Sequence, residues 1–173
     1  MRKLKIQMNI LLDNKWDNDM REFCIDNLQN VDCILHGRKT AEGFIPYWNE
    51  VADNACDSEY MLGKRFTEIA QVVFSNTIAK SNWDNTTIIN GEVKDAISNL
   101  KNKNGNDILV YGGDSFVTSL LQHGQVDEIF LLINPATLGN GQETFNPLRI
   151  NPEFNLTNSK RFKCGTMMLQ YTK

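Results

Sequence analysis

The stretch from Ile108 to Leu121 constrains the fold of this chain more than any other. It begins with four apolar residues, 108–111, which are typical of a buried strand. Two glycines follow at once. The apolar residues of the second half then recur at helical spacing on one face: Phe116, Val117, Leu120 and Leu121. A strand that runs through a tight turn straight into a helix is the building unit of layered α/β proteins.

The glycines Gly112 and Gly113 lie where this strand is expected to meet its helix. Because glycine has no Cβ, backbone N–H groups there can approach a bound group closely, and a helix start favours negative charge. The turn therefore fits a phosphate. An ordinary tight connection, with Asp114 or Ser115 capping the helix, explains the same residues. The dinucleotide fingerprint G-x-G-x-x-G is not met here.

Composition narrows the class of protein. The 173 residues are 41% hydrophobic and 23% charged, which is typical of a globular chain that forms a core without disulfides. We expect a single domain over residues 1–173. The formal charge of −3 argues against nucleic acid or an anionic membrane as a partner. The four cysteines and two histidines show no metal-like spacing, so we expect no metal, reduced thiols and a cytoplasmic protein.

Strands and helices are predicted to alternate along most of the chain. Strands are expected near 4–12, 31–35, 71–74, 86–89, 108–111 and 128–133. Helices are expected after Asp17 or Asn18, over 58–69, near 93–100 and after 113, with a short one between 40 and 54. Pro46 should lie in the first turn of that short helix or break it. A closing hairpin is expected to turn at Cys164-Gly165. The fold class is therefore α/β, a mixed, mostly parallel twisted sheet flanked by helices with an antiparallel C-terminal edge.

Polar residues follow three of the predicted strands. In open α/β sheets, ligands gather at the carboxyl ends of the strands. Each run alone fits an ordinary loop, but three runs that converge on one edge would suit an anionic nucleotide. The runs are Gly37, Arg38, Lys39 and Thr40; Ser75, Asn76 and Thr77; and Gly112, Gly113, Asp114 and Ser115.

The ordered set of these motifs resembles the dihydrofolate reductase superfamily, in its branch with the C-terminal reductase domain of bacterial RibD and stand-alone relatives. The resemblance covers the chain from about Lys3 to Tyr171. Its motifs are Gly37-Arg-Lys-Thr, Val73-Phe-Ser-Asn-Thr, Val110-Tyr-Gly-Gly-Asp-Ser, Val126-Asp-Glu-Ile and Pro135-x-x-Leu-Gly-x-Gly.

The resemblance implies that NADPH lies across the strand ends and that the protein is a homodimer. Arg38 and Lys39 would meet the 2′-phosphate or the pyrophosphate, with Gly37 and Thr40 beside them. The run 75–77 would border the adenosine. The diphosphate and nicotinamide side would be lined by Gly112, Gly113, Asp114, Ser115 and Phe116. Tyr111 would form part of the substrate-side wall, unless it only packs in the core.

One region departs from the family pattern. Relatives follow the first strand with a Ser-x-Asp-Gly-like turn and a longer loop over the nicotinamide. Here the chain reads Asn9-Ile-Leu-Leu-Asp13-Asn, without the glycine and with a shortened loop. Asp13 is the candidate catalytic acid, and it fits equally well as a plain residue that ends the strand.

The resemblance implies an NADPH-dependent reductase that transfers a hydride to a C=N or C=O group of a small heterocyclic or sugar-linked substrate. The candidate settings are riboflavin and pterin metabolism, with a 5-amino-6-(5-phosphoribosylamino)uracil reductase-like or dihydrofolate reductase-like activity. Two alternatives stay open. One is a nucleotide-binding protein of the same fold whose short loop no longer supports turnover, and the other is a dimeric interaction module.

Overall fold

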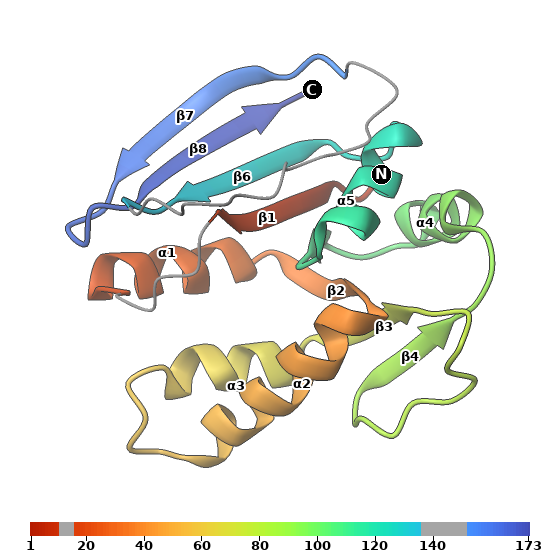
Figure 1. Ribbon diagram of the computed structural model, residues 1–173, viewed down its shortest axis with the longest axis horizontal. Helices are drawn as coiled ribbons and strands as arrows, with labels where there is room; N and C mark the ends of the chain where they lie inside the picture. Colours follow the sequence, from red (N-terminus) through yellow and green to blue (C-terminus); the bar gives the residue numbers. More distant parts are fainter. Residues whose placement is uncertain (11–15, 136–151) are drawn as a thin grey trace, which may run out of the picture.

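The computed structural model describes residues 1–10, 16–135 and 152–173 (Figure 1). Its strands are β1 (Leu4–Ile10), β2 (Val31–Gly37), β3 (Ala70–Phe74), β4 (Thr86–Ile89), β5 (Asp107–Val110), β6 (Glu128–Ile133), β7 (Asn155–Arg161) and β8 (Met167–Thr172). Its helices are α1 (Asn18–Leu28), α2 (Arg38–Asp53), α3 (Tyr60–Glu68), α4 (Val93–Asn102) and α5 (Asp114–Gln122).

Within the described residues, all the strands form one sheet in the order β4-β3-β2-β5-β1-β6-β8-β7. The neighbours from β4 to β6 pair in parallel. The last two strands pair antiparallel, β8 with β6 and β7 with β8. This arrangement confirms the predicted fold class, including its antiparallel C-terminal edge.

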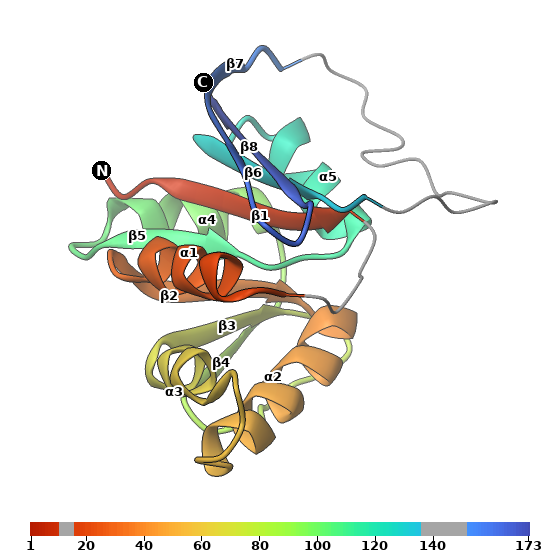
Figure 2. The same cartoon turned by 90° about the vertical axis from the view of Figure 1, so that its left-hand side faces the viewer.

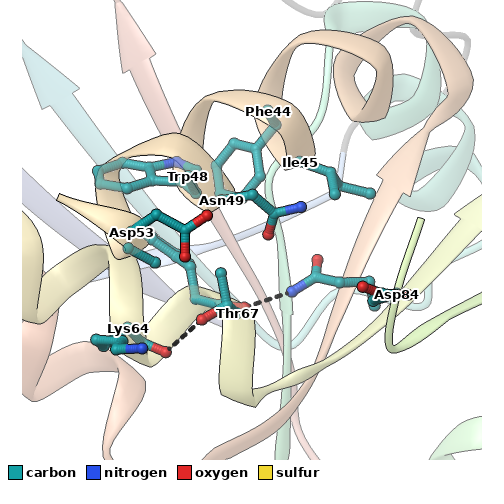
Figure 3. A pocket seen from close by; sticks show the side chains of 11 residues that line it. Phe44, Ile45, Trp48, Asn49, Asp53, Lys64, Thr67 and Asp84 are labelled. Carbon is teal, nitrogen blue, oxygen red and sulfur yellow. Dashed lines mark hydrogen bonds between the residues drawn. The ribbon is translucent and has the colours of Figure 1, made fainter.

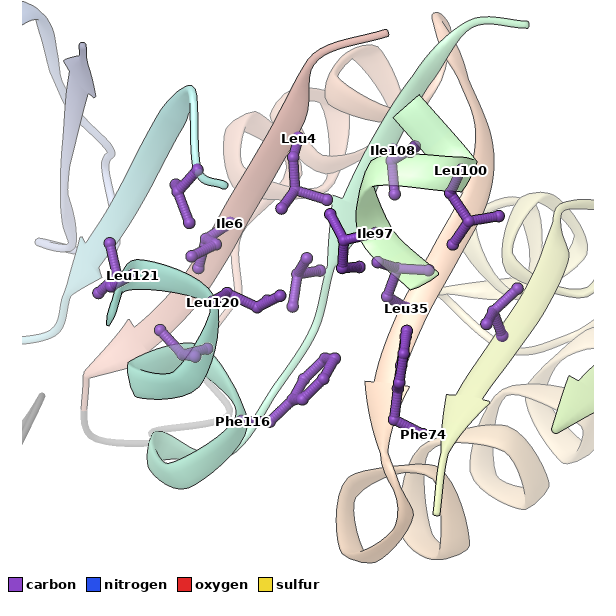
Figure 4. Close-up of a cluster of buried hydrophobic side chains, with 14 of the residues drawn as sticks. Leu4, Ile6, Leu35, Phe74, Ile97, Leu100, Ile108, Phe116, Leu120 and Leu121 are labelled. Carbon is purple, nitrogen blue, oxygen red and sulfur yellow. The ribbon is translucent and has the colours of Figure 1, made fainter. Parts of the chain in front are cut away.

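Helices cover both faces of the sheet, because the strands alternate apolar side chains between two cores. Leu4, Ile6 and Ile108 point to the face covered by α4 and α5, where they meet Ile97 and Leu120 (Figure 4). The helices α1, α2 and α3 lie over the opposite face (Figure 2). Apolar residues of the sheet pack against them there. Cys24 and Cys33 are buried and belong to these cores.

The connections that follow the neighbouring strands β2 and β5 lead in opposite directions along the sheet. From β2 the chain crosses through α2 to β3, while from β5 it crosses through α5 to β6 on the far side of β1. The two helices lie on opposite faces but begin at the same edge. Such a switch point is where open α/β sheets bind ligands.

The prediction for Pro46 was wrong. The helix α2 begins at Arg38, so Pro46 lies in its interior rather than in its first turn. An interior proline removes one helical hydrogen bond and costs about 3 kcal/mol. Pro46 is exposed, whereas Ala41, Ile45 and Trp48 on the same helix are buried, so burial of that face offsets the cost.

A buried histidine links β2, β3 and the turn after β5. Gln71 Nε2 donates to the carbonyls of Phe66 (2.8 Å) and Ile69 (3.1 Å), so its Oε1 faces His36 Nε2 at 2.7 Å and accepts from it. His36 Nδ1 lies 2.9 Å from the carbonyl oxygen of Tyr111, which accepts from this nitrogen only when the ring is protonated, so this contact favours the charged form. Burial lowers the pKa of His36 from its ordinary 6.5, and the contacts with Gln71 and Tyr111 offset this only in part.

The buried imidazole predicts a loss of stability in mild acid. The folded protein keeps His36 neutral to a lower pH than the unfolded chain does, so below about pH 6.5 the unfolded chain binds an extra proton. The free energy of unfolding should fall by up to about 1.4 kcal/mol per pH unit from there toward the folded-state pKa. Urea denaturation between about pH 7.5 and 5.5 measures this. The slope of the free energy of unfolding against pH should shrink in His36→Gln and persist in His123→Gln, where the side chain is exposed. Equal slopes in both variants would contradict the role of His36.

Two helical glycines predict opposite effects of one substitution. A Cβ on Gly43 in α2 would meet nothing within 4 Å, so Gly43→Ala should raise the free energy of unfolding by about 0.5–1 kcal/mol. A Cβ on Gly63 in α3 would lie 2.8 Å from Val51 Cγ1 and 2.9 Å from the Ala52 nitrogen. Gly63→Ala should therefore lower that free energy by about 1–2 kcal/mol, since overpacking outweighs the helix preference. Urea denaturation compares the variants, and a stabilising Gly63→Ala would contradict the close packing of α2 on α3.

Candidate functional site

A cavity of about 690 Å³ lies outside the carboxyl ends of β2, β3 and β5, and we call it the β2–β5 cavity. All three predicted runs line it. Its residues are Gly37, Arg38, Lys39, Thr40, Phe74, Ser75, Asn76, Thr77, Ile89, Gly91, Val93, Gly113, Asp114, Ser115 and Phe116. Of the residues predicted to bind a cofactor, Gly112 alone lies apart from this cavity, and it lines the neighbouring one.

The starts of α2 and α5 lie against each other in this cavity. Gly113 N–H donates to Thr40 Oγ1 at 3.1 Å. A Cβ on Gly37 would come within 3.3 Å of the Cβ of Phe116, so glycine at this position permits the close approach of the two helices. Two helix starts therefore present their positive ends to one space.

Neither helix start is capped by a side chain. The N-cap residues are Gly37 for α2 and Gly113 for α5, and neither cap makes a side-chain hydrogen bond. The prediction that Asp114 or Ser115 caps α5 was wrong, because the helix begins at Asp114 and both residues lie in its first turn. A helix start left without such a cap suits an anionic ligand.

The turn after β3 uses its polar side chains to hold its own shape. Ser75 Oγ accepts from the N–H groups of Thr77 (3.1 Å) and Ile78 (3.0 Å). Asn76 Oδ1 accepts from the Gly91 N–H at 3.0 Å, which joins this turn to the one after β4. These bonds build a fixed wall of the cavity.

The β2–β5 cavity carries two cations beside the helix starts. Arg38 Nη1 pairs with Glu42 Oε1 at 2.6 Å, one turn along α2. Lys39 is exposed and has no ion pair within the part of the chain that the structure describes. Because its charge is not met by a carboxylate there, Lys39 is the freer of the two cations to meet an anion.

A second cavity of about 790 Å³ opens beside the first, and we call it the aromatic cavity. It lies between α1, α2 and the ends of β1 and β5. Its residues are Gln7, Met8, Asn9, Trp16, Arg21, Thr40, Phe44, Tyr47, Trp48, Asp57, Ser58, Glu59, Phe66, Tyr111, Gly112, Gly113 and Asp114. Thr40, Gly113 and Asp114 line both cavities, so the two spaces meet at the glycine turn after β5.

Tyr111 is central to the wall of the aromatic cavity. Its ring stacks on Phe44, with centroids 5.1 Å apart, and meets the edge of Phe66 at 5.3 Å. Burial raises the pKa of Tyr111 well above its ordinary value, so the phenol stays protonated. Tyr111 thus packs in the core and also lines a cavity, while its place in a substrate-side wall stays a prediction.

A third cavity of about 270 Å³ lies behind the same aromatic wall, between α2 and α3 (Figure 3). Phe44, Trp48 and Phe66 separate it from the aromatic cavity. Its rim consists of exposed polar side chains such as Asn49 and Asp53 (Figure 3). Its described lining contains no buried polar atom that lacks a hydrogen-bond partner, so no such atom there is left for a ligand to pair with.

Several cavity residues were not found from the sequence. Asn9 lies in β1, Arg21 in α1, and Asp57 and Glu59 in the loop between α2 and α3, so only the fold brings these three segments together. Asp13, the candidate acid, lies outside the described residues. Within those residues no group of three or more potential metal-ligating side chains occurs, and none of their helices has the length and hydropathy of a membrane-spanning segment.

Comparison with known proteins identifies the family. The sequence profile of the RibD C-terminal domain matches residues 13–168. Bacillus subtilis (strain 168) has two curated relatives named as uncharacterized proteins. YyaP is 30% identical over 181 residues, covering 98% of this chain and 94% of YyaP. YwjB is 24% identical, covering 87% of this chain and 76% of YwjB.

Solved structures share the fold at low sequence identity. A Shewanella sp. PV-4 protein, provisionally named for riboflavin biosynthesis, superposes with a TM-score of 0.71 at 18% identity, covering 99% of this chain and 98% of that one. A Thermotoga maritima diaminohydroxyphosphoribosylaminopyrimidine deaminase/5-amino-6-(5-phosphoribosylamino)uracil reductase has a TM-score of 0.64 at 17% identity, covering 99% of this chain and 56% of that one. The resemblance proposed from the sequence is confirmed, and the chain belongs to the RibD C-terminal domain family.

Proposed function

We propose that this protein is an NADPH-dependent reductase whose cofactor lies in the β2–β5 cavity and whose substrate lies in the aromatic cavity. The observation that carries the proposal is the pair of uncapped helix starts, α2 and α5, which meet beside Arg38 and Lys39. Two helix ends and two cations suit the several phosphates of a phosphorylated dinucleotide.

The reaction class is supported by the family and by the way the cavities adjoin. One structural neighbour is named as a uracil reductase and another for riboflavin biosynthesis. We propose hydride transfer to a C=N or C=O group of a small heterocyclic or sugar-linked substrate. The shared lining at Thr40, Gly113 and Asp114 lets a cofactor in one cavity touch a substrate in the other.

The residues of the chain have separate tasks in this proposal. NADPH supplies the hydride when it is bound. The first-turn N–H groups of α2 and α5 bind its phosphates. Because Gly112 and Gly113 have no Cβ, the cofactor can lie close to the backbone where the two cavities meet. The rings of Phe44 and Tyr111 exclude water from the substrate side. Asp13 is the proposed proton donor.

Removing either cation should weaken binding of NADPH more than binding of NADH. A charge-assisted hydrogen bond contributes about 1.5–3 kcal/mol, so Lys39→Ala and Arg38→Ala should each cost roughly tenfold or more in NADPH affinity. Lys39→Ala is expected to cost more, because Arg38 is already paired with Glu42. Isothermal titration with both cofactors measures the effect. The control is Lys64→Ala, which removes an exposed cation beside the third cavity; equal losses for NADPH and NADH would reject contact with the extra phosphate.

Turnover separates an active reductase from a protein that only binds the nucleotide. Oxidation of NADPH should depend on a pterin or pyrimidine substrate and should be lost in Asp13→Asn, while NADPH affinity stays unchanged. Absorbance at the nicotinamide band follows the reaction. Saturable NADPH binding without turnover on any substrate would favour the nucleotide-binding alternative. If the folded protein binds neither NADPH nor NADH, both the active reductase and the nucleotide-binding protein are rejected, and the dimeric interaction module is the alternative that is left.

A further inference from the structure

The aromatic cavity differs in charge from the β2–β5 cavity beside it. Its described lining contains three carboxylates, Asp57, Glu59 and Asp114, and one cation, Arg21. Arg21 Nε lies 3.9 Å from Glu59 Oε1, so the one cation already faces a carboxylate. Asp57 and Asp114 have no ion pair within the described residues. The described lining of this cavity is therefore acidic, whereas the cofactor side, which shares Asp114, also carries Arg38 and Lys39.

The carboxylates are held in place on the rim by the loop between α2 and α3. Asp57 Oδ1 accepts from the Glu59 N–H at 2.7 Å. Glu59 Oε2 accepts from the Tyr47 hydroxyl at 3.1 Å. Because these bonds fix the carboxylates, an anionic substrate would meet negative charge that the loop does not easily move away.

The walls of this cavity suit a flat ring. Phe44 and Tyr111 stack on each other, and Trp48 meets Phe66 at 4.6 Å between centroids. Trp16 and Tyr47 complete an aromatic lining that comes from α2, α3, the residue after β5 and the segment before α1. Aromatic side chains bind planar heterocycles through stacking and edge contacts over a large apolar area.

Unpaired polar atoms gather around the same cavity. Among the described residues, four buried side-chain atoms lack a hydrogen-bond partner, and three of them belong to the lining: Asn9 Oδ1, Arg21 Nε and Tyr111 Oη. Leaving such an atom unpaired costs about 1–3 kcal/mol. Each of these atoms is closed off from the open space of the cavity, so an N–H or C=O group on the edge of a substrate ring pairs with one of them after a small shift of the side chains around it.

We propose that the aromatic cavity selects an uncharged planar nitrogen heterocycle that carries no phosphate or carboxylate group. Asn9 and Tyr111 pair with the polar edge of the ring, and the carboxylates of Asp57 and Glu59 exclude anionic substrates. This inference rests on the proposed function and names its substrate class. It separates this chain from a reductase that acts on a phosphorylated compound such as 5-amino-6-(5-phosphoribosylamino)uracil.

The proposed exclusion of anionic substrates is tested with a matched pair of probes, 6-hydroxymethylpterin and pterin-6-carboxylate. Each is titrated calorimetrically into the full chain. The uncharged pterin should bind at least tenfold more tightly. Equal affinities, or tighter binding of the carboxylate, would overturn the proposal. NADPH is titrated in parallel. If NADPH binds and neither pterin does, the substrate class is wrong and the proposed cofactor site stands; if nothing binds, the proposed function fails as well.

Asp57→Asn tests the role of the acidic rim. Asparagine keeps the oxygen that accepts from the Glu59 N–H, so the loop retains its bond while one charge is removed. The preference for the uncharged pterin should shrink severalfold, through tighter binding of pterin-6-carboxylate. Asp53→Asn, which removes an exposed acid in α2 at the third cavity, is the matched control and should leave the preference unchanged. The same preference in Asp57→Asn as in the native chain would reject the rim as the cause.

Tyr111→Phe tests the unpaired hydroxyl. Removal of a buried, unpaired hydroxyl should leave the melting temperature unchanged or raise it, whereas a hydroxyl that pairs with the ring predicts about tenfold weaker binding of 6-hydroxymethylpterin. Tyr171→Phe in β8 removes a hydroxyl away from the cavity and should leave the affinity for 6-hydroxymethylpterin unchanged. A lower melting temperature with unchanged affinity would assign Tyr111 to folding alone and overturn its role in recognition.

Discussion

The divergence of two crossovers at the β2–β5 pair sets the position of everything else in this site. Because α2 and α5 leave adjacent parallel strands toward opposite faces, their starts meet at one edge of the sheet. Glycine at the N-cap of α2 lets the helices approach, and glycine at both N-caps leaves their first turns without side-chain caps. The partial positive charge of two helices then faces a single cavity, and the cations of the first α2 turn add to it.

The same turn after β5 divides the site into two chemically distinct halves. On one side lie the helix starts, Arg38 and Lys39; on the other lie aromatic rings and carboxylates. Backbone at Gly113 belongs to both, and its N–H is held by Thr40. In the proposed function, such a change of charge over a short distance would keep a polyanionic cofactor out of the substrate half, because the carboxylates there repel its phosphates.

Much of the fold and half of the site could be predicted from local sequence patterns. Period-two and helical apolar spacing indicated the strands and helices, and polar runs at three strand ends indicated the β2–β5 cavity. The cap of α5 was missed because Asp114 has a good capping side chain and yet lies inside the first turn. Pro46 was misplaced because packing of the α2 face outweighs a local propensity. The aromatic cavity depends on long-range contacts such as Arg21 with Glu59, for which no local pattern exists.

The central claim is that the paired helix starts hold the phosphates of the cofactor. Amide chemical shifts of the isotopically labelled protein, recorded during titration with NADPH, test it most directly, since they report on each backbone N–H separately. The account predicts the largest changes at 38–40 and 114–116 together, saturating with a single affinity. Changes confined to one of these helix starts, or centred on a surface away from the β2–β5 cavity, would contradict it.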